Sequence, residues 1–396
     1  MRPGPRDEHR YYRRVTFSAA TRCWGLALAL GTALPAADQS APPTSPKAPA
    51  TPAYDHAWSA PIESPGQIHV ASDGTLVFAL DGKHGLRAFT VDDGRIVWTM
   101  KGVTAEARLA GGGGLLFVAT PPRPEADSQV QTPGRLDAVA QIDGRLVWTA
   151  RVDVTAAVDP VVLSGSVILA ADRELREYSS RDGSVAWQQT FDAPPVALAD
   201  DDGRLFVALA NNTLLSLDEK THARMFETAL ESAAVALVAA EGRVFVSDTE
   251  GSLVAYRQDR AGSFLWRVRR AEVIGRPAVD ERHVYVAQFD NTARAYDVGN
   301  GTERWRLRLD TRPLPGVQIA VGWVFFPLLS GSVASATAVT RTGQPSGEIP
   351  LAAPEASGDQ RLHASRMTRD GRVIARISRP SSHPAWTLTV AKRKDG

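Results

Sequence analysis

The feature that most constrains the fold of this chain is a repeat of about 40 residues. The segments AFTVDDGRIVW (88–98), AVAQIDGRLVW (138–148), EYSSRDGSVAW (177–187) and AYDVGNGTERW (295–305) share an apolar stretch, a turn and a final tryptophan. The aromatic residues at this position are separated by 40, 50, 39, 39, 40 and 39 residues, and they are Trp58, Trp98, Trp148, Trp187, Phe226, Trp266 and Trp305. The one long interval contains a proline-rich polar segment (120–134), which indicates an enlarged loop. The regular period predicts a single large repeat fold rather than several unrelated domains.

A second pattern lies inside each period, where a short apolar run follows a turn residue. It occurs eight times, as GTLVFAL (74–80), GLLFVAT (114–120), GSVILAA (165–171), GRLFVAL (203–209), GRVFVSD (242–248), RHVYVAQ (282–288), GWVFFPL (322–328) and GRVIARI (371–377). These runs are rich in β-branched and aromatic residues and are apolar at consecutive positions, as expected of strands covered on both faces. The sequence therefore predicts eight interior strands.

Each period contains enough chain for four strands, for example 276–279, 283–289, 292–297 and 303–309. A sheet of this size cannot bury both faces alone, so it must stack against copies of itself. Four-stranded antiparallel sheets arranged radially form a β-propeller. The predicted fold is therefore all-β, an eight-bladed propeller that occupies residues 54–396.

The two ends of the repeat region complement each other. The last unit supplies only three strands (361–371, 372–378 and 385–391), whereas the segment YDHAWSAPIE (54–63) resembles an outer strand with no inner strands before it. We therefore expect the N-terminal strand to complete the eighth blade and close the ring, which removes open sheet edges.

The glycines before the tryptophans suggest how neighbouring blades meet. Gly94, Gly144, Gly183, Gly262 and Gly301 each lie four residues before their tryptophan, in a turn where positive φ is easiest for glycine. An indole at the start of the outer strand can bury roughly 150–250 Å² against the next blade. The fourth unit has His222 and Phe226 at these positions, and the seventh (340–351) has no aromatic residue. We expect those two junctions to be the loosest.

The first 53 residues differ from the repeats. A basic stretch precedes the apolar run CWGLALALGTALPAA (23–37), which predicts a signal peptide or signal anchor over residues 1–37. Residues 38–53 are rich in proline and alanine and are predicted to be a disordered linker. The only cysteine, Cys23, precedes the apolar run rather than following it, which argues against a lipid-modified cysteine at a cleavage site. The expected location is outside the cytoplasm, either periplasmic or tethered to a membrane.

Charge and composition exclude several functions. The net charge is only +1, so no basic excess points to nucleic acid. The eight histidines are scattered without a metal-binding spacing. The glycine run at 111–114 is not followed by Lys-Ser or Lys-Thr, so it is interpreted as a turn rather than a phosphate-binding loop.

The Ala-x5-Gly-x3-Trp spacing, best kept at 88–98, 138–148 and 295–305, resembles the docking repeat of pyrroloquinoline-quinone-type propellers. The resemblance covers about residues 54–394. That family includes quinoprotein dehydrogenases and also non-enzymatic relatives similar to the assembly lipoprotein BamB. The resemblance implies a propeller fold and leaves both kinds of function open.

Polar residues recur in the turns between the second and third strands of the units, and these turns should share one face of the ring. The candidate mouth residues are Asp81, Asp172, Asn211, Asn212, Asp248, Asp290 and Asn291. Oxygen atoms arranged in this way could hold a cation or a polar ligand. Asp and Asn are also favoured in tight hairpins whatever the function, and turn chemistry is the interpretation that we favour.

The sequence favours a non-catalytic scaffold in the cell envelope that binds envelope or membrane-associated proteins as a monomeric ring. No catalytic residue, metal or cofactor is predicted for such a protein. The alternatives are a quinoprotein dehydrogenase that uses pyrroloquinoline quinone with calcium, and a ligand-sensing propeller. The units are nearly minimal, and the chain lacks the adjacent cysteines that the resemblance associates with the dehydrogenases, so the scaffold is the leading hypothesis.

Overall fold

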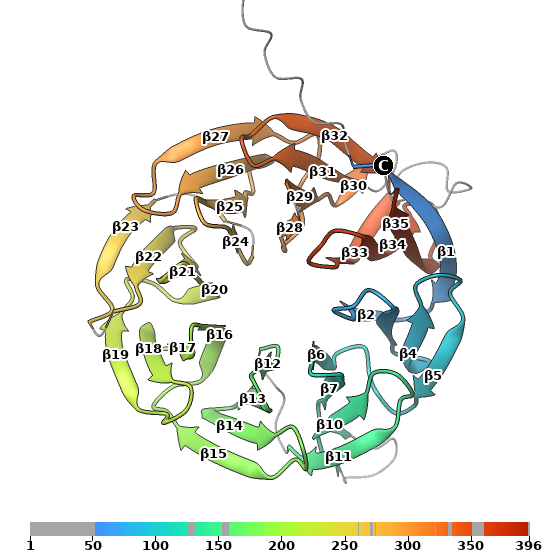
Figure 1. Ribbon diagram of the computed structural model, residues 1–396, viewed down its shortest axis with the longest axis horizontal. Coiled ribbons are helices and arrows are strands. Elements are labelled where there is room, and N and C mark those ends of the chain that lie inside the picture. The colour runs from blue at the N-terminus through green and yellow to red at the C-terminus, as the bar shows by residue number, and fades with distance from the viewer. Residues whose placement is uncertain are drawn as a thin grey trace, which may run out of the picture. The chain divides into compact units, whose positions relative to one another are not determined.

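Every repeat unit folds into one antiparallel sheet, and eight such sheets stand around a central axis (Figure 1). A computed structural model of the chain describes residues 52–124, 131–152, 158–259, 261–269, 272–273, 275–320, 322–331, 335–350 and 360–394. The predicted signal segment (1–37) lies outside the described residues, as does the predicted linker except for its last two residues. The eight-bladed all-β propeller predicted from the repeats is confirmed for the unit that begins at Ala48.

The strands follow the chain from the axis outward in each of the first seven blades. Blade 1 contains β2 (Pro65–Val70), β3 (Leu76–Asp81), β4 (Gly85–Thr90) and β5 (Ile96–Met100). Blade 2 contains β6 (Arg108–Gly112), β7 (Leu115–Thr120), β10 (Arg135–Ala140) and β11 (Leu146–Arg151), and β8 (Arg123–Pro124) pairs with β9 (Gln131–Thr132) in its insertion. Blade 3 contains β12 (Val161–Val162), β13 (Ser166–Ala171), β14 (Glu174–Ser179) and β15 (Val185–Thr190). Blade 4 contains β16 (Pro195–Asp201), β17 (Arg204–Leu209), β18 (Thr213–Asp218) and β19 (Arg224–Ala229).

The second half of the ring repeats this arrangement. Blade 5 contains β20 (Ala234–Ala240), β21 (Arg243–Asp248), β22 (Leu253–Arg257) and β23 (Phe264–Val268). Blade 6 contains β24 (Ala278–Val279), β25 (His283–Ala287), β26 (Thr292–Asp297) and β27 (Glu303–Arg308). Blade 7 contains β28 (Gln318–Ala320), β29 (Trp323–Pro327), β31 (Ser335–Thr340) and β32 (Pro345–Pro350). Blade 8 contains β33 (Gln360–Met367), β34 (Val373–Pro380), β35 (Trp386–Arg393) and β1 (Tyr54–Ile62), with β30 (Ser330–Gly331) added beside β33.

The second strand of each blade forms the core. All six residues of β3 and of β13 and the first six of β34 are buried, and β7, β17, β21, β25 and β29 are buried over at least four consecutive residues. These strands are the eight apolar runs of the sequence. Because each is sandwiched between two neighbouring blades, both of its faces are covered, which explains why the runs do not alternate between apolar and polar residues.

The ring is closed by pairing between the two ends of the repeat region. Strand β1 pairs antiparallel with β35, with Trp58 opposite Val390. The Tyr54 hydroxyl donates to the Gly371 carbonyl at 2.6 Å, and Ile62 is 1% exposed. Figure 1 shows β1 beside β35 at the point where the colours of the two chain ends meet. The predicted closure of the eighth blade by the N-terminal strand is confirmed.

The predicted docking aromatics pack on the turn between the third and fourth strands of the next blade. The Trp58 indole Nε1 donates to the Val91 carbonyl at 2.9 Å, and a methyl group added to Gly94 would lie only 2.5 Å from the ring. Gly94 has φ +71°, which L-residues with side chains rarely adopt. The aromatic residue and the glycine that receives it are Trp58 with Gly94, Trp98 with Gly144, Trp148 with Gly183, Phe226 with Gly262, Trp266 with Gly301 and Trp305 with Gly343. The glycine is therefore needed for its conformation and also for the space that the neighbouring ring occupies.

The junction between blades 3 and 4 uses a different contact, because His222 takes the place of the glycine. Its backbone keeps the positive φ of that position, at +57°. The imidazole stacks on Trp187 with ring centres 4.3 Å apart and an angle of 8° between the planes. His222 Nε2 also lies 2.6 Å from an oxygen of Glu177, which stands opposite Trp187 in the register where most blades have alanine. That this junction is among the loosest stays a prediction.

Blade 7 has no docking aromatic, and the topology of blade 8 explains why. In blade 1 the docking residue Trp98 stands opposite Ala88. In blade 7 the equivalent residue is Gly347, which stands opposite Ala338. The third and fourth strands of blade 8 are β35 and β1, which belong to opposite ends of the chain and are joined by no turn. Blade 8 therefore offers no glycine turn on which a ring from blade 7 could dock.

The docking contact predicts coupled losses of stability at Trp98 and Gly144. Trp98→Ala should lower the free energy of unfolding by about 3–5 kcal/mol, because it removes a large buried side chain. Gly144→Ala should also destabilise, because the new methyl group would meet the indole at 2.5 Å and the backbone has φ +72°. In the double variant the steric part of the Gly144→Ala cost should disappear, which chemical denaturation of the four proteins would show.

The matched control for this cycle is Ile142→Ala, in the same turn as Gly144 but 78% exposed. It should change the free energy of unfolding by less than about 0.5 kcal/mol. Strictly additive effects of Trp98→Ala and Gly144→Ala would show that the two residues do not interact as described.

Candidate functional site

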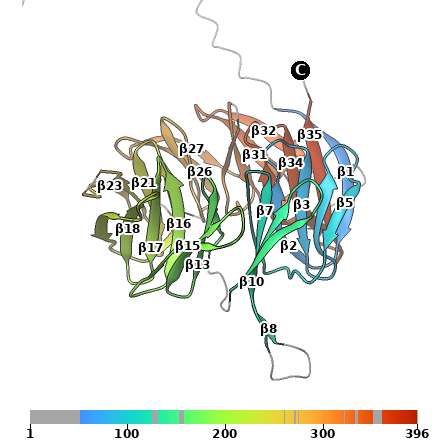
Figure 2. The same ribbon diagram turned by 60° about the horizontal axis from the view of Figure 1, so that its bottom comes forward.

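The two faces of the ring carry different structures. Because the strands of a blade alternate in direction, the turns between second and third strands share one face with the linkers between blades, and we call this the mouth face. The other face carries the remaining turns and both ends of the described chain, with the Lys394 amide donating to the Ala53 carbonyl at 2.9 Å, and we call it the terminal face. Figure 2 shows strand β8 projecting on the side opposite the C-terminal end.

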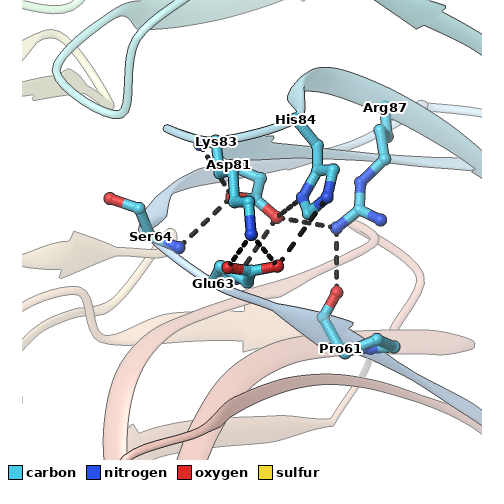
Figure 3. A network of polar contacts seen from close by, with 7 residues as sticks. All are labelled: Pro61, Glu63, Ser64, Asp81, Lys83, His84 and Arg87. Atoms are coloured by element: carbon cyan, nitrogen blue, oxygen red, sulfur yellow. Dashed lines mark hydrogen bonds and ion pairs between the residues drawn. The ribbon is translucent and has the colours of Figure 1, made fainter.

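The candidate mouth residues do lie in turns of one face, and Asp81 among them is fully buried. Its carboxylate accepts hydrogen bonds from the backbone amides of Glu63 and Ser64, both at 3.2 Å, and from that of Lys83 at 3.1 Å. His84 Nδ1 and Arg87 Nη2 each lie 2.9 Å from Oδ2 of the same carboxylate (Figure 3). Asp81 thus fixes the linker that leads from the ring-closing strand β1 into blade 1.

A second set of contacts surrounds this carboxylate. The Lys83 ammonium lies 2.6 Å from the Glu63 carboxylate, and Arg87 Nη2 also donates to the Pro61 carbonyl at 2.8 Å (Figure 3). Burial alone would raise the pKa of Asp81, but hydrogen bonds from His84 and the backbone amides outweigh it and hold that pKa below its ordinary value. All the acceptor capacity of Asp81 is therefore used within the protein.

The other candidate mouth residues are used mainly in their own turns. Asp248 is 6% exposed, and its Oδ1 accepts the Ser252 amide at 2.7 Å. Asp290 accepts the Thr292 amide at 3.0 Å and pairs with Arg294 at 2.9 Å. Residues Asp172, Asn212 and Asn291 have φ of +52°, +64° and +60°, the conformation that turns demand and that Asp and Asn tolerate best. Asn211 precedes Asn212 in the same turn and is exposed.

The first strands of the blades surround a central channel that contains a cavity of about 650 Å³. Its polar lining comes from the first strands of blades 1, 4, 7 and 8 and from the linkers that lead into blades 3 and 6, and includes His69, Asp159, Asp200, Arg276, Gln318 and Arg366. On one side of the cavity, Asp159 accepts from Gln67 Nε2 at 2.8 Å and from Arg108 Nη1 at 3.3 Å. These contacts join blades 1, 2 and 3 near the axis.

The remaining charged groups of the channel are less fully paired. Burial among protein atoms lowers the pKa of Arg276; the charges of Asp200 and Asp159 counter that shift, and the charge of Arg366 adds to it. Burial likewise raises the pKa of Asp200, and Arg276 counters it. His69 lies over the backbone of Gly111, and burial, helped by Arg366, lowers its pKa to about 4, so this imidazole is neutral at pH 7.

A second cavity of about 430 Å³ opens on the mouth face beside the channel. Its walls include Pro65, Ala105, Leu314, Pro327 and His363, and it shares Arg366 with the channel. Burial lowers the pKa of His363 below its ordinary value.

An exposed apolar cluster lies on the same face, between blades 6 and 7. Phe289 is 53% exposed and Leu329 is 37% exposed. The Arg312 guanidinium stacks over the Phe289 ring at 4.9 Å, and the Arg312 carbonyl accepts the Leu329 amide at 2.8 Å. We refer to Phe289, Arg312 and Leu329 as the mouth cluster.

Within the described residues, no three His, Cys, Asp or Glu side chains are arranged to hold a metal ion. The described part of the chain also contains no helix of the length and hydropathy needed to cross a bilayer.

Sequence reasoning found the mouth turns but missed the channel. Gln67, Arg108, Asp159 and Arg276 have no motif spacing, because each comes from a different blade. Arg108, Asp159 and Arg276 fall at equivalent repeat positions, at or just before the first strand of blades 2, 3 and 6, and Gln67 lies within the first strand of blade 1. Alignment of the units against one another, column by column, would have shown polar residues at a position that is small or apolar elsewhere.

The comparisons with known proteins agree with this architecture. The family model described as outer membrane protein assembly factor BamB matches residues 82–200 and 210–382, which is more than half of the chain. No curated protein matches the sequence.

Solved structures show the same fold at low sequence identity. BamB from Moraxella catarrhalis superposes with a TM-score of 0.60 at 13% identity, over 86% of this chain and 99% of the other. The WD40 domain of Neurospora crassa Pan2 superposes with a TM-score of 0.52 at 11% identity, over 73% of this chain and 90% of the other. At these identities the likeness concerns the fold alone.

The hydrogen bonds of Asp81 predict a pH-dependent contribution to stability. Because its folded pKa lies below the unfolded value of about 3.9, its contribution is present above that pH and is lost as the pH falls through the folded pKa. Asp81→Asn should lower the free energy of unfolding by about 1–3 kcal/mol at pH 7, and the difference from the wild type should shrink below pH 4. Denaturant titrations across this range measure the effect.

Asp310→Asn supplies the control, because Asp310 is an exposed carboxylate in the linker that follows β27 on the same face. Its effect should stay below about 0.5 kcal/mol at every pH. A constant difference between Asp81→Asn and the wild type down to the lowest pH would contradict the role given to the Asp81 carboxylate.

Proposed function

We propose, on the premise that this chain belongs to the family described as outer membrane protein assembly factor BamB, that it is a non-catalytic scaffold that binds other proteins of the cell envelope. The name of the family indicates a role in assembling outer membrane proteins. The specific partners and the export of this chain are part of the proposal.

The observation that carries the proposal is how the polar residues of the mouth face are used. Asp81, Asp248 and Asp290 all accept hydrogen bonds within their own turns or linkers, so these carboxylates support the loops that the ring displays. A closed ring holds loops from several blades in fixed relation, and a partner can bind them without reorganisation of the protein. Rigid display of loops is what a scaffold requires.

The mouth face is the proposed contact surface. It carries the exposed mouth cluster, the opening of the 430 Å³ cavity and the β8–β9 insertion. Exposed aromatic and arginine side chains are enriched at protein interfaces. Ala53 lies on the opposite face, where its carbonyl accepts the Lys394 amide.

Site-specific photo-crosslinking tests this proposal in cells of the source organism. A photoreactive residue in place of Leu329 should form a crosslink to a defined envelope protein, and the added substitution Phe289→Ser should reduce its yield several-fold. Ile142 is the matched control position, because it is an apolar residue that is 78% exposed on the terminal face. Crosslinks from position 142 alone, or none from position 329, would contradict the assignment of the mouth face.

The alternative functions make a different prediction about cofactors. A quinoprotein dehydrogenase or a sensor of that cofactor should bind pyrroloquinoline quinone in the presence of calcium, whereas the scaffold should not. We expect no tight binding when the purified protein is titrated with both and followed by the absorbance of the quinone, and no oxidation of alcohols or aldoses with artificial electron acceptors. Micromolar binding with turnover would favour the dehydrogenase, and binding without turnover would favour the sensor.

A further inference from the structure

The channel contains a charge arrangement that the scaffold function does not use. Among the described residues that line the 650 Å³ cavity, the cationic side chains are Arg276 and Arg366 and the carboxylates are Asp159 and Asp200. Arg108 and Gln67 both bind Asp159, so that carboxylate is already partnered. Apart from Asp159, the cavity lining therefore contains two guanidinium groups, of Arg276 and Arg366, and one carboxylate, of Asp200.

The two guanidinium groups come from different blades and face the same space. Arg276 immediately precedes blade 6, whereas Arg366 lies in β33 of blade 8. Within the described part of the chain, neither has a carboxylate within ion-pair distance, and Arg366 Nη1 donates only to the Ser365 carbonyl, at 3.1 Å. A guanidinium carries five N–H donors in a planar fork. Both side chains line the cavity, and the hydrogen bonds described for them use few of these donors.

Electrostatics supports the same conclusion. Arg366 lies close enough for its charge to lower the pKa of Arg276, and the neighbouring imidazole of His69 is neutral at pH 7. Arginine keeps its proton under all ordinary conditions, so the excess positive charge cannot be relieved by titration. An anion from solution would relieve it.

We propose that the central channel binds a small oxyanion, a carboxylate or a phosphate, between Arg276 and Arg366. The guanidinium fork matches the paired oxygens of either group, and charge-assisted hydrogen bonds of this kind are among the strongest in proteins. A cavity of about 650 Å³ is of the size that small-molecule ligands occupy. The site is independent of the mouth cluster and stands whether or not the scaffold function is correct.

The test uses inorganic phosphate and succinate as probes, each compared with sodium chloride at equal ionic strength. Calorimetric titration and the melting temperature of the whole protein should show binding of at least one probe in the millimolar range or tighter. Binding of phosphate alone assigns the site to phosphate groups, and binding of succinate alone assigns it to carboxylates.

Three variants make the test specific. Arg276→Gln and Arg366→Gln should each weaken binding by about tenfold or more, since each removes a charge-assisted contact. Asp200→Asn should tighten binding, because it removes the carboxylate that competes for Arg276. This gain is an effect that a purely structural role for these residues would not produce.

Arg308→Gln is the matched control, because Arg308 is an exposed arginine on β27, the outermost strand of blade 6, whereas the channel is lined by first strands and linkers. It should bind the probes as the wild type does. Arg276→Lys keeps the positive charge but loses the planar fork of N–H donors. It supplies a second measurement if Arg276→Gln folds poorly. Absence of binding by the wild type, or equal binding by all variants, would overturn the proposal.

Discussion

Neighbouring blades are held together by an aromatic ring that packs on the backbone of a glycine in the next blade. The contact is possible only because the glycine lacks a side chain and tolerates a positive φ, as Gly144 does beneath Trp98 at φ +72°. Where the ring is a tryptophan on a glycine, its indole also donates a hydrogen bond to the same turn, as Trp98 does to the Gln141 carbonyl at 2.8 Å. Such a junction satisfies a polar group as well as burying apolar area. Because each blade uses its own fourth strand to reach the turn of the next, the contact fixes the angle and spacing between sheets around the ring.

The exceptions to this contact follow from the same geometry. At the junction of blades 3 and 4, His222 stands where the other turns have glycine, and its imidazole stacks on Trp187. Glu177 stands opposite Trp187, where most blades have a small residue, and its carboxylate binds His222 Nε2. At the junction of blades 7 and 8 no ring is present, since β35 and β1 are joined by no turn. At this junction β30, which follows β29 of blade 7, pairs with β33 of blade 8. Closure of the ring depends on the ladder between β1 and β35 inside blade 8, with Asp81 of blade 1 fixing the linker that leaves β1.

A ring built in this way has two distinct regions where a ligand or partner can bind. The mouth face presents loops whose carboxylates are committed to their own turns, together with the exposed Phe289 and Leu329. The channel collects side chains from the first strands and the linkers before them, and its guanidinium groups are incompletely paired. The mouth face suits a protein surface because it is exposed and partly apolar. The channel suits a small anion because charged side chains from several blades line one cavity.

The sequence by itself determined the number of blades, their strand order and the closure of the ring, because a period of about 40 residues and eight buried runs leave few other ways to cover both faces of each sheet. It also determined the docking residues, since a tryptophan four residues after a glycine recurs in most units. It could not show which blade receives each ring: the partner of Trp58 is Gly94, 36 positions later in the sequence, and only the radial stacking brings them together. The channel was likewise decided by tertiary structure alone. Arg276 and Arg366 are 90 residues apart with no motif between them, and they share one cavity because the first strands of all blades converge on the axis.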